Sequence, residues 1–291
     1  MCRRRVMSGR IIFGVCRVLP MLRRAGIISK PTEEALSTAR EIGEFLEERG
    51  VEVLWEKDSA ARIGAGGVSI RNMKAELYIV LGGDGMMLWA CSQGAGHDAP
   101  VIGFNFGTTG FLTEAMPEEW RSVLERVLAG EGYVEERSML RVEVEGEPAG
   151  EVLNEVVVSA GTPVKMLEMS LRVNGELVYR LRADGLIAAT PTGSTAYSMS
   201  AGGPVLDPAT PAIVLTPLCP FGSGYRSIVV PETSTVEVVV ENGKERGMLV
   251  LDGQSMRELE FGAAVQISLA ERRLKLLRLK RDFYRRVREF L

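Results

Sequence analysis

Residues 184–203 have the sequence DGLIAATPTGSTAYSMSAGG, and this stretch is the most informative part of the chain. It begins with an acid and a short apolar strand, and five hydroxyl side chains, a tyrosine and three glycines follow from residue 192 onward. A core element would not gather so many polar groups, because each one buried without a partner costs about 1–3 kcal/mol. A solvated linker would not carry the apolar strand. We therefore interpret the stretch as a site that holds a polar ligand close to the backbone.

A second glycine-rich turn lies a hundred residues upstream. The sequence GGDG at residues 82–85 follows the apolar run 77–81 and precedes a predicted helix over 86–91. Ligands of open α/β sheets bind at the carboxyl ends of strands, where glycines let a phosphate approach the backbone and a helix start offers free N–H groups. A carboxylate would repel that phosphate, so Asp84 needs another role. It could accept a proton from an attacking hydroxyl, help to hold a divalent cation, or simply form an Asp-Gly turn.

Two further polar motifs follow or interrupt apolar strands. The loop GFNFGTTGFLTE at 103–114 contains three glycines and three threonines at the end of a strand. Asn154 and Glu155 enter an otherwise apolar strand over 153–158. Their amide and carboxylate suit a ribose or the edge of a base. Each motif also has a plain structural interpretation, the loop as a connection and the pair as polar residues at a sheet edge.

Hydrophobic periodicity predicts two domains and a returning tail. Strands over 25–29, 51–55, 77–81 and 100–104 alternate with helical patterns, which predicts a parallel, helix-covered sheet in an α/β domain over 23–135. Short β-branched runs and a hairpin signal at 173–176 predict an antiparallel β-sandwich over 136–270. The segment 271–291 predicts a strand around 274–279 and then an amphipathic helix.

Nine arginines and lysines lie between Arg272 and Arg288. Such a cluster could bind nucleic acid or a membrane surface. We favour a solvated face opposite an apolar stripe that docks on the protein. The first 22 residues carry Arg3, Arg4 and Arg5 before a short, charge-interrupted apolar run, which only loosely resembles a signal peptide. We interpret them as an N-terminal extension that is either disordered or not native.

The bulk composition excludes several classes of protein. A net charge of −3 argues against a general nucleic-acid binder. A single histidine, His97, rules out a multi-histidine metal site, and the four cysteines lack zinc-ligand spacing. The sequence contains no stretch of about 20 apolar residues, which a membrane-spanning helix would need. We therefore expect a cytoplasmic protein with neither nucleic acid nor membrane as a partner.

Taken together, the motifs resemble those of the NAD kinase family. The matching segments are GGDG at 82–85, GFLTE at 110–114, the Asn-Glu pair at 154–155 and the long run at 184–204. Their order and separation also match, and the likeness extends from about residue 25 to the end. The resemblance implies an α/β domain, a β-sandwich domain and a chain end that returns to the first domain. It also implies a homo-oligomer, a dimer or a tetramer.

The resemblance implies an enzyme that transfers the terminal phosphoryl group of ATP, or of polyphosphate, to the 2′-hydroxyl of the adenosine ribose of NAD, giving NADP. A divalent cation, Mg²⁺ by expectation, would assist; its ligands are not assigned. Asp84 would be the catalytic proton acceptor, and Gly82, Gly83 and Gly85 would form the phosphate loop. The implied NAD-binding residues are Asp84, Gly85, Phe111, Asn154, Glu155, Lys165, Arg182, Asp184, Thr195, Ala196, Tyr197, Ser198, Met199, Ser200 and Gln254.

Some positions depart from the family pattern. Met86 stands where relatives often carry a small polar residue, and Phe221 stands where many bacterial members have histidine. The pair Thr108-Thr109 also differs from the common one. These departures leave the phosphoryl donor and the subunit contacts open. Two other functions remain as alternatives, namely another phosphoryl transferase such as a lipid or sugar kinase, and a catalytically silent nucleotide sensor.

Overall fold

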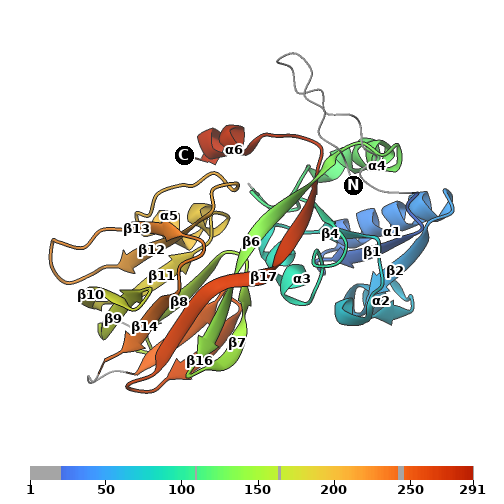
Figure 1. Ribbon diagram of the computed structural model, residues 1–291. Helices are drawn as coiled ribbons and strands as arrows, with labels where there is room; N and C mark the ends of the chain where they lie inside the picture. Colours follow the sequence, from blue (N-terminus) through green and yellow to red (C-terminus); the bar gives the residue numbers. More distant parts are fainter. Residues whose placement is uncertain (1–20, 109, 163–164, 242–245, 291) are drawn as a thin grey trace, which may run out of the picture. The chain divides into compact units, whose positions relative to one another are not determined.

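The computed structural model describes residues 21–108, 110–162, 165–241 and 246–290, which divide into two compact units (Figure 1). Unit 1 comprises the residues up to Glu135 together with those from Lys275 onward, and unit 2 comprises Glu136–Leu274. The predicted N-terminal extension falls almost wholly on residues 1–20, outside the described residues.

Unit 1 is built on a parallel sheet in the order β5-β4-β1-β2-β3. Leu276, near the end of strand β17 (Ala264–Arg278), adds a further parallel pairing through Val101 of β5. The elements are β1 (Arg24–Ser29), α1 (Glu33–Glu47), β2 (Glu52–Glu56), α2 (Lys57–Ile63), β3 (Gly67–Val68), β4 (Leu77–Leu81), α3 (Asp84–Ser92), β5 (Val101–Phe104), α4 (Trp120–Leu128) and α6 (Phe283–Phe290), with single 3₁₀ turns at Ile70–Asn72 and Pro117–Glu119.

Helices cover both faces of this sheet. On one face α1 and α4 pack on the strands (Figure 1). Their apolar side chains share a single buried cluster with those of the strands, and the rings of Phe45 and Trp120 meet edge to face at 5.3 Å. Side chains alternate along a strand, so Gly103 faces the opposite side from Ile102 and Phe104. There it lies against Met87 of α3. The helix-covered parallel sheet predicted from the alternating pattern is therefore confirmed.

Unit 2 is an antiparallel β structure of two sheets. Its elements are β6 (Tyr133–Val144, which starts in unit 1), β7 (Glu147–Val152), β8 (Glu155–Ala160), β9 (Leu167–Val173), β10 (Glu176–Ala183), β11 (Gly185–Ala189), a 3₁₀ turn (Gly193–Thr195), α5 (Tyr197–Ser200), β12 (Ala212–Leu218), β13 (Ile228–Pro231), β14 (Val236–Val240), β15 (Gly247–Leu251), β16 (Ser255–Leu259) and β17 (Ala264–Arg278). One sheet has the order β13-β12-β11-β8-β15-β16, and the other contains β10-β9-β14-β17 with β6 and β7.

Inward-facing residues of both sheets form one core. Val156 and Leu186 of the first sheet share a buried cluster with Leu171 and Val238 of the second. The hairpin signal is also explained, because Asn174 (φ 52°) and Gly175 (φ 81°) adopt the left-handed conformation that a two-residue hairpin turn needs. The expectation of an all-β second domain is confirmed.

The end of the chain differs from the prediction in one respect. The strand expected around 274–279 is the last part of the 15-residue strand β17, which begins at Ala264. Within this strand Glu271 and Arg272 project into solvent. Arg273 instead donates hydrogen bonds to Ser138 and Glu232. Because the tail belongs to unit 1, its predicted return to the first domain is confirmed.

Candidate active site

The carboxyl ends of three neighbouring parallel strands place the glycine-rich turn at one edge of the unit 1 sheet. Strands β1, β4 and β5 end at Ser29, Leu81 and Phe104. The Gly82 N–H donates to the Phe104 carbonyl at 3.0 Å, and the Lys30 N–H donates to the Leu81 carbonyl at 2.8 Å. Residues 82–85 therefore lie where open α/β sheets bind ligands.

Asp84 is the first residue of α3, and its carboxylate is held by another loop. Its Oδ2 accepts a hydrogen bond from the Phe111 N–H at 2.7 Å, and its Oδ1 accepts one from the Leu112 N–H at 3.0 Å. The side chain is half-buried. These two backbone donors fix the orientation of the carboxylate, as a positioned proton acceptor requires.

Gly110 is required where the loop passes this carboxylate. A Cβ at position 110 would clash with the Thr113 hydroxyl and would lie 2.9 Å from Asp84 Oδ1. Any larger residue would push the loop away from the acid. The glycine of the GFLTE motif thus permits the close approach that lets two N–H groups reach Asp84.

The sequence analysis missed Lys30, which lies at the same edge. Its ammonium donates to the Phe106 carbonyl at 2.6 Å and lies 5.4 Å from the centre of the Phe106 ring. Asn105 shapes the same loop, because its side chain accepts from the Gly107 N–H and donates to the Thr108 carbonyl. A cation placed directly after a buried parallel strand was the available signal for Lys30.

Two arginines of the tail contact the loop that holds Asp84. Arg278 donates to the carbonyls of Phe111, Leu112 and Thr113 at 2.9–3.0 Å, and its side chain is only 6% exposed. Arg286 donates to the Thr113 carbonyl at 2.7 Å. The expectation that the basic cluster forms a solvated face is therefore wrong for these two residues, because their guanidinium groups satisfy backbone carbonyls.

The same tail covers the ring of Phe111. This ring lies 6.2 Å from the ring of Phe283 and 5.6 Å from that of Phe290, both on α6. Phe111 is therefore packed inside unit 1, in addition to any contact with a base that the resemblance implies.

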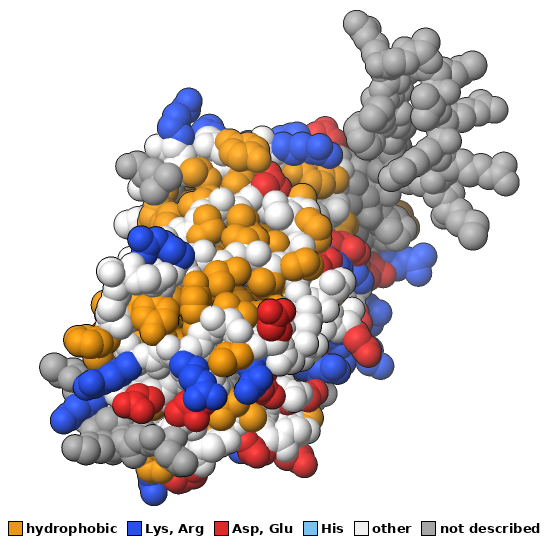
Figure 2. All heavy atoms as spheres, turned by 60° about the vertical axis from the view of Figure 1, so that its left-hand side comes forward, with side chains coloured by type: hydrophobic (Ala, Val, Ile, Leu, Met, Phe, Trp, Pro, Cys, Tyr) orange, Lys and Arg blue, Asp and Glu red, His pale blue; other side chains and the backbone are white. Residues whose placement is uncertain are grey.

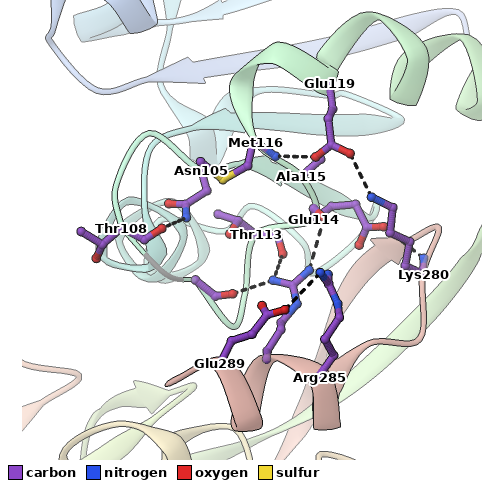
Figure 3. A pocket seen from close by; sticks show the side chains of 12 residues that line it. Asn105, Thr108, Thr113, Glu114, Ala115, Met116, Glu119, Lys280, Arg285 and Glu289 are labelled. Atoms are coloured by element: carbon purple, nitrogen blue, oxygen red, sulfur yellow. Dashed lines mark hydrogen bonds and ion pairs between the residues drawn. The ribbon is translucent and has the colours of Figure 1, made fainter. Parts of the chain in front are cut away.

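A pocket of about 270 Å³ opens between this loop region and α6 (Figure 3). Lys280 pairs with Glu119 at 3.0 Å and Arg285 pairs with Glu289 at 3.5 Å on its wall. Burial raises the pKa of Glu114, against the lowering effect of the nearby Arg278. The lining residues are Asn105, Thr108, Gly110, Thr113, Glu114, Ala115, Met116, Glu119, Lys280, Arg285, Arg286 and Glu289. Because three basic and three acidic side chains are mixed here, the lining favours neither a cationic nor an anionic ligand.

In unit 2 the Asn154-Glu155 pair is organised by Asp252, a residue that sequence reasoning did not select. The Asp252 carboxylate accepts hydrogen bonds from the N–H groups of Leu153, Asn154 and Glu155 at 2.8–3.0 Å. Burial raises the pKa of Asp252, while these three N–H groups lower it. Its place in an Asp-Gly turn two residues before Gln254 made it look like an ordinary hairpin residue.

Glu155 is a buried acid with a strongly raised pKa. Burial, followed by the negative charge of Asp252, raises the pKa of Glu155 from 4.5 to about 7, and the Tyr197 N–H lowers it. Its Oε2 is buried and has no hydrogen-bond partner among the described residues. Asn154 beside it is also buried. An unpartnered buried acceptor is suited to a hydroxyl of a bound sugar.

The buried hydroxyls of the 190–200 segment have partners within the protein. Thr190 donates to the Leu153 carbonyl at 2.6 Å, Ser194 to the Pro191 carbonyl, and Thr195 to the Thr192 carbonyl. Thr192 accepts from the buried Arg137, and Ser198 bonds Thr216. These hydrogen bonds offset the free-energy cost of burying the hydroxyls, which was the reason for expecting a ligand. They also shape the turn, and each hydroxyl keeps further capacity for a ligand.

The structure separates the predicted NAD-binding residues of unit 2 into two groups. Asn154, Glu155 and Tyr197 lie together near the end of β11 where Ala189 pairs with Glu155. Asp184 directly precedes the other end of β11, about 17 Å away by strand rise, and Arg182 lies two residues earlier in β10. The first group is joined by Thr195, Ala196, Ser198, Met199 and Ser200 on the turn and by Gln254 beside Asp252, and Lys165 lies near the second group.

Comparison with known proteins places this arrangement in a family. A model of the ATP-NAD kinase N-terminal domain matches residues 25–132, and a model of the ATP-NAD kinase C-terminal domain matches residues 153–279. The chain belongs to the ATP-NAD kinase family. The resemblance drawn from its motifs is confirmed, and the protein is an enzyme, a kinase.

Individual relatives cover nearly the whole chain. The NAD kinase of Methanothermobacter thermautotrophicus is 41% identical over 272 residues, which span 92% of this chain and 96% of that protein. The NAD kinase of Koribacter versatilis is 38% identical and covers 93% of this chain. Among solved structures, yeast NADH kinase complexed with NADH aligns with a TM-score of 0.86 at 25% identity, covering 93% of this chain and 87% of that one. An NAD kinase from Archaeoglobus fulgidus in complex with ATP aligns with a TM-score of 0.74 at 30% identity, covering 91% and 98%.

Proposed function

We propose that this ATP-NAD kinase family member transfers the terminal phosphoryl group of ATP, or of polyphosphate, to the 2′-hydroxyl of the adenosine ribose of NAD, and so makes NADP. The observation that carries the proposal is the Asp84 carboxylate, held at the carboxyl edge of a parallel sheet by the N–H groups of Phe111 and Leu112. The relatives support ATP as the donor and a nicotinamide dinucleotide as the acceptor, because one solved structure holds ATP and another holds NADH.

The proposed reaction needs one proton acceptor. The ribose 2′-oxygen attacks the terminal phosphorus, a new O–P bond forms, and the bond between that phosphorus and the bridging oxygen breaks. Its electron pair leaves with ADP, or with the shortened polyphosphate, and the hydroxyl proton passes to Asp84. Gly83 and Gly85 leave the backbone open for the phosphates beside the start of α3, and Gly82 makes room for the Met86 side chain in the same turn.

The residues of unit 2 would bind the adenosine portion. Asn154 offers an amide, and the unpartnered Oε2 of Glu155 would accept a ribose hydroxyl. The turn from Thr195 to Ser200 would line the nucleotide site, and Gln254, Lys165, Arg182 and Asp184 would supply further contacts. These roles extend the family resemblance to positions of this chain.

A divalent cation such as Mg²⁺ would take only a few of its ligands from the protein at this site. Among the described residues no group of three or more His, Cys, Asp or Glu side chains could hold a metal ion alone. Mg²⁺ commonly keeps one or two carboxylates and takes its other ligands from substrate phosphates and water. Asp84 is the carboxylate available for it in the glycine-rich turn. When bound, the cation would neutralise negative charge on the transferring phosphoryl group.

We also propose that the protein is a homo-oligomer, a dimer or a tetramer. Large apolar side chains are exposed on unit 2, including Phe221 at 69% and Met256 at 72%. Figure 2 shows apolar side chains gathered on the face that carries the strands at the left of Figure 1. Light scattering on a size-exclusion column tests this, and a monomer at micromolar concentration would contradict it.

No described helix is long and apolar enough to cross a membrane.

The activity is tested with a panel of donors and acceptors. The purified protein is incubated with Mg²⁺, with ATP or polyphosphate, and with NAD, NADH or 2′-deoxy-NAD, and the phosphorylated product is measured. We expect NADP from NAD and no product from the 2′-deoxy compound. If neither donor gives product with NAD, the proposed function is wrong.

A further inference from the structure

We propose that Arg286 is a positioning residue for phosphoryl transfer, because it holds the loop whose N–H groups orient Asp84. This inference rests on the proposed role of Asp84 as the proton acceptor. Arg286 lies on α6, more than 170 residues after the loop in the sequence, and belongs to a helix that supplies none of the residues implied by the family motifs.

The guanidinium of Arg286 reaches carbonyls on both sides of the two N–H donors. Nη1 donates to the carbonyls of Gly110 and Thr113, and Nη2 donates to that of Glu114 at 3.2 Å. The donors that hold Asp84 belong to Phe111 and Leu112, the residues between those carbonyls. Fixing the carbonyls before and after this pair fixes the direction of its N–H groups.

Arg286 is itself held in place from its own helix turn. Its Nε donates to Asp282 Oδ1 at 2.9 Å, and its side chain is 12% exposed. A guanidinium is planar and has five donors in a fixed geometry, so a single Arg can bind Asp282 and three carbonyls together. The single ammonium of a lysine cannot reproduce this fork.

Arg286 is separable from the folding of unit 1, unlike Arg278. Arg278 lies in β17 with a nearly buried side chain that also pairs with Glu114 and Glu135, so its loss would leave two acids without their cation. By contrast, no described residue of α6 is fully buried, and Asp282 keeps its ion pair with Arg285 at 2.6 Å when the Arg286 side chain is removed. Removing the Arg286 side chain should therefore leave the fold intact and free the loop.

The experiment compares Arg286→Ala and Arg286→Lys with Arg288→Ala, an exposed arginine of the same helix. For Arg286→Ala we expect kcat to fall about 10- to 100-fold, because small misplacements of a catalytic group have effects of this size. We expect KM for ATP to change less than about threefold, the melting temperature to match that of Arg288→Ala, and the stoichiometry of NAD binding to stay at wild-type level. Arg286→Lys should restore less than about a tenth of the lost kcat.

A double-mutant cycle with Asp84→Asn distinguishes positioning from a general structural role. If Arg286 acts through Asp84, adding Arg286→Ala to Asp84→Asn should lower the residual rate less than about twofold. Four outcomes would each overturn the inference. They are an unchanged kcat in Arg286→Ala, full recovery of kcat in Arg286→Lys, a loss of kcat matched by a lower stoichiometry of NAD binding, and additive losses in the cycle. If Asp84→Asn alone keeps full activity, the proposed role of Asp84 as the proton acceptor is wrong. The single variant therefore distinguishes a failure of the proposed function from a failure of this inference.

Discussion

The Asp252 carboxylate accepts a hydrogen bond from the backbone N–H of Asn154 at 2.8 Å, although the two residues are 98 positions apart in the chain. The neighbouring N–H groups of Leu153 and Glu155 bind the same carboxylate. A turn between β15 and β16 thereby fixes the start of β8, where the proposed adenosine contacts lie. The proposed NAD-binding pair depends on an acid that need not touch NAD.

We predict that Asp252→Asn weakens NAD binding. The amide of Asn has one acceptor oxygen and two donors, so it cannot satisfy three N–H groups, and hydrogen bonds to a charged group contribute about 1.5–3 kcal/mol each. KM for NAD should rise about tenfold or more, with a smaller change in kcat. Steady-state kinetics measure this, with Glu258→Gln on the adjacent β16 as the control that removes an exposed charge. Equal KM values in both variants would show that Asp252 does not organise the site.

Glu155 should make the stability of the protein depend on pH. Its pKa is raised from 4.5 to about 7, so between these values the folded protein binds a proton that the unfolded chain releases. The folded state is therefore favoured below pH 4.5, and this contribution is lost as the pH rises to about 7. The difference corresponds to about 3 kcal/mol.

Glu155→Gln isolates this effect because glutamine does not titrate. We expect the variant to be close to wild type in unfolding free energy at pH 5 and more stable than wild type at pH 8. Denaturant titrations at the two pH values give the difference directly. If the difference in unfolding free energy between variant and wild type is the same at both pH values, the pKa of Glu155 is not raised in the folded protein.

Gly193→Ala should disrupt the turn that follows β11. A Cβ at this position would clash with the backbone carbonyl oxygen of Asn154, which cannot move without breaking its bond from the Thr190 N–H. We expect a loss of about 1–3 kcal/mol in unfolding free energy, together with weaker NAD binding. The control is Gly224→Ala, since a Cβ there meets nothing within 4 Å. Similar stability of the two variants would contradict this close packing.

The location of the candidate site could be predicted because it depends on the local pattern of apolar and polar residues. Apolar runs that end at Leu81 and Phe104 mark the strand ends, and parallel strands bring those ends to one edge. Asp84 follows directly from this geometry. The family motifs then supplied the residues of unit 2.

The supporting residues could not be predicted, because their partners are remote in the sequence. Arg278 and Arg286 looked like solvated charges, and only the fold reveals the carbonyls that they bind more than 160 residues away. Asp252 had the appearance of a turn residue for the same reason. The hydroxyls of Thr190 and Ser194 suggested a ligand, since nothing in the sequence shows that backbone carbonyls accept their hydrogen bonds.

The central claim is that Asp84 receives the proton of the ribose hydroxyl, and turnover of Asp84→Asn tests it most directly. NADP formation and NAD binding by calorimetry would be measured on this variant and on Asp58→Asn, an exposed acid in the first turn of α2. We predict that Asp84→Asn binds NAD but loses at least about 100-fold in kcat, the loss typical of removing a general base, while Asp58→Asn keeps its activity. Wild-type turnover by Asp84→Asn would contradict the account.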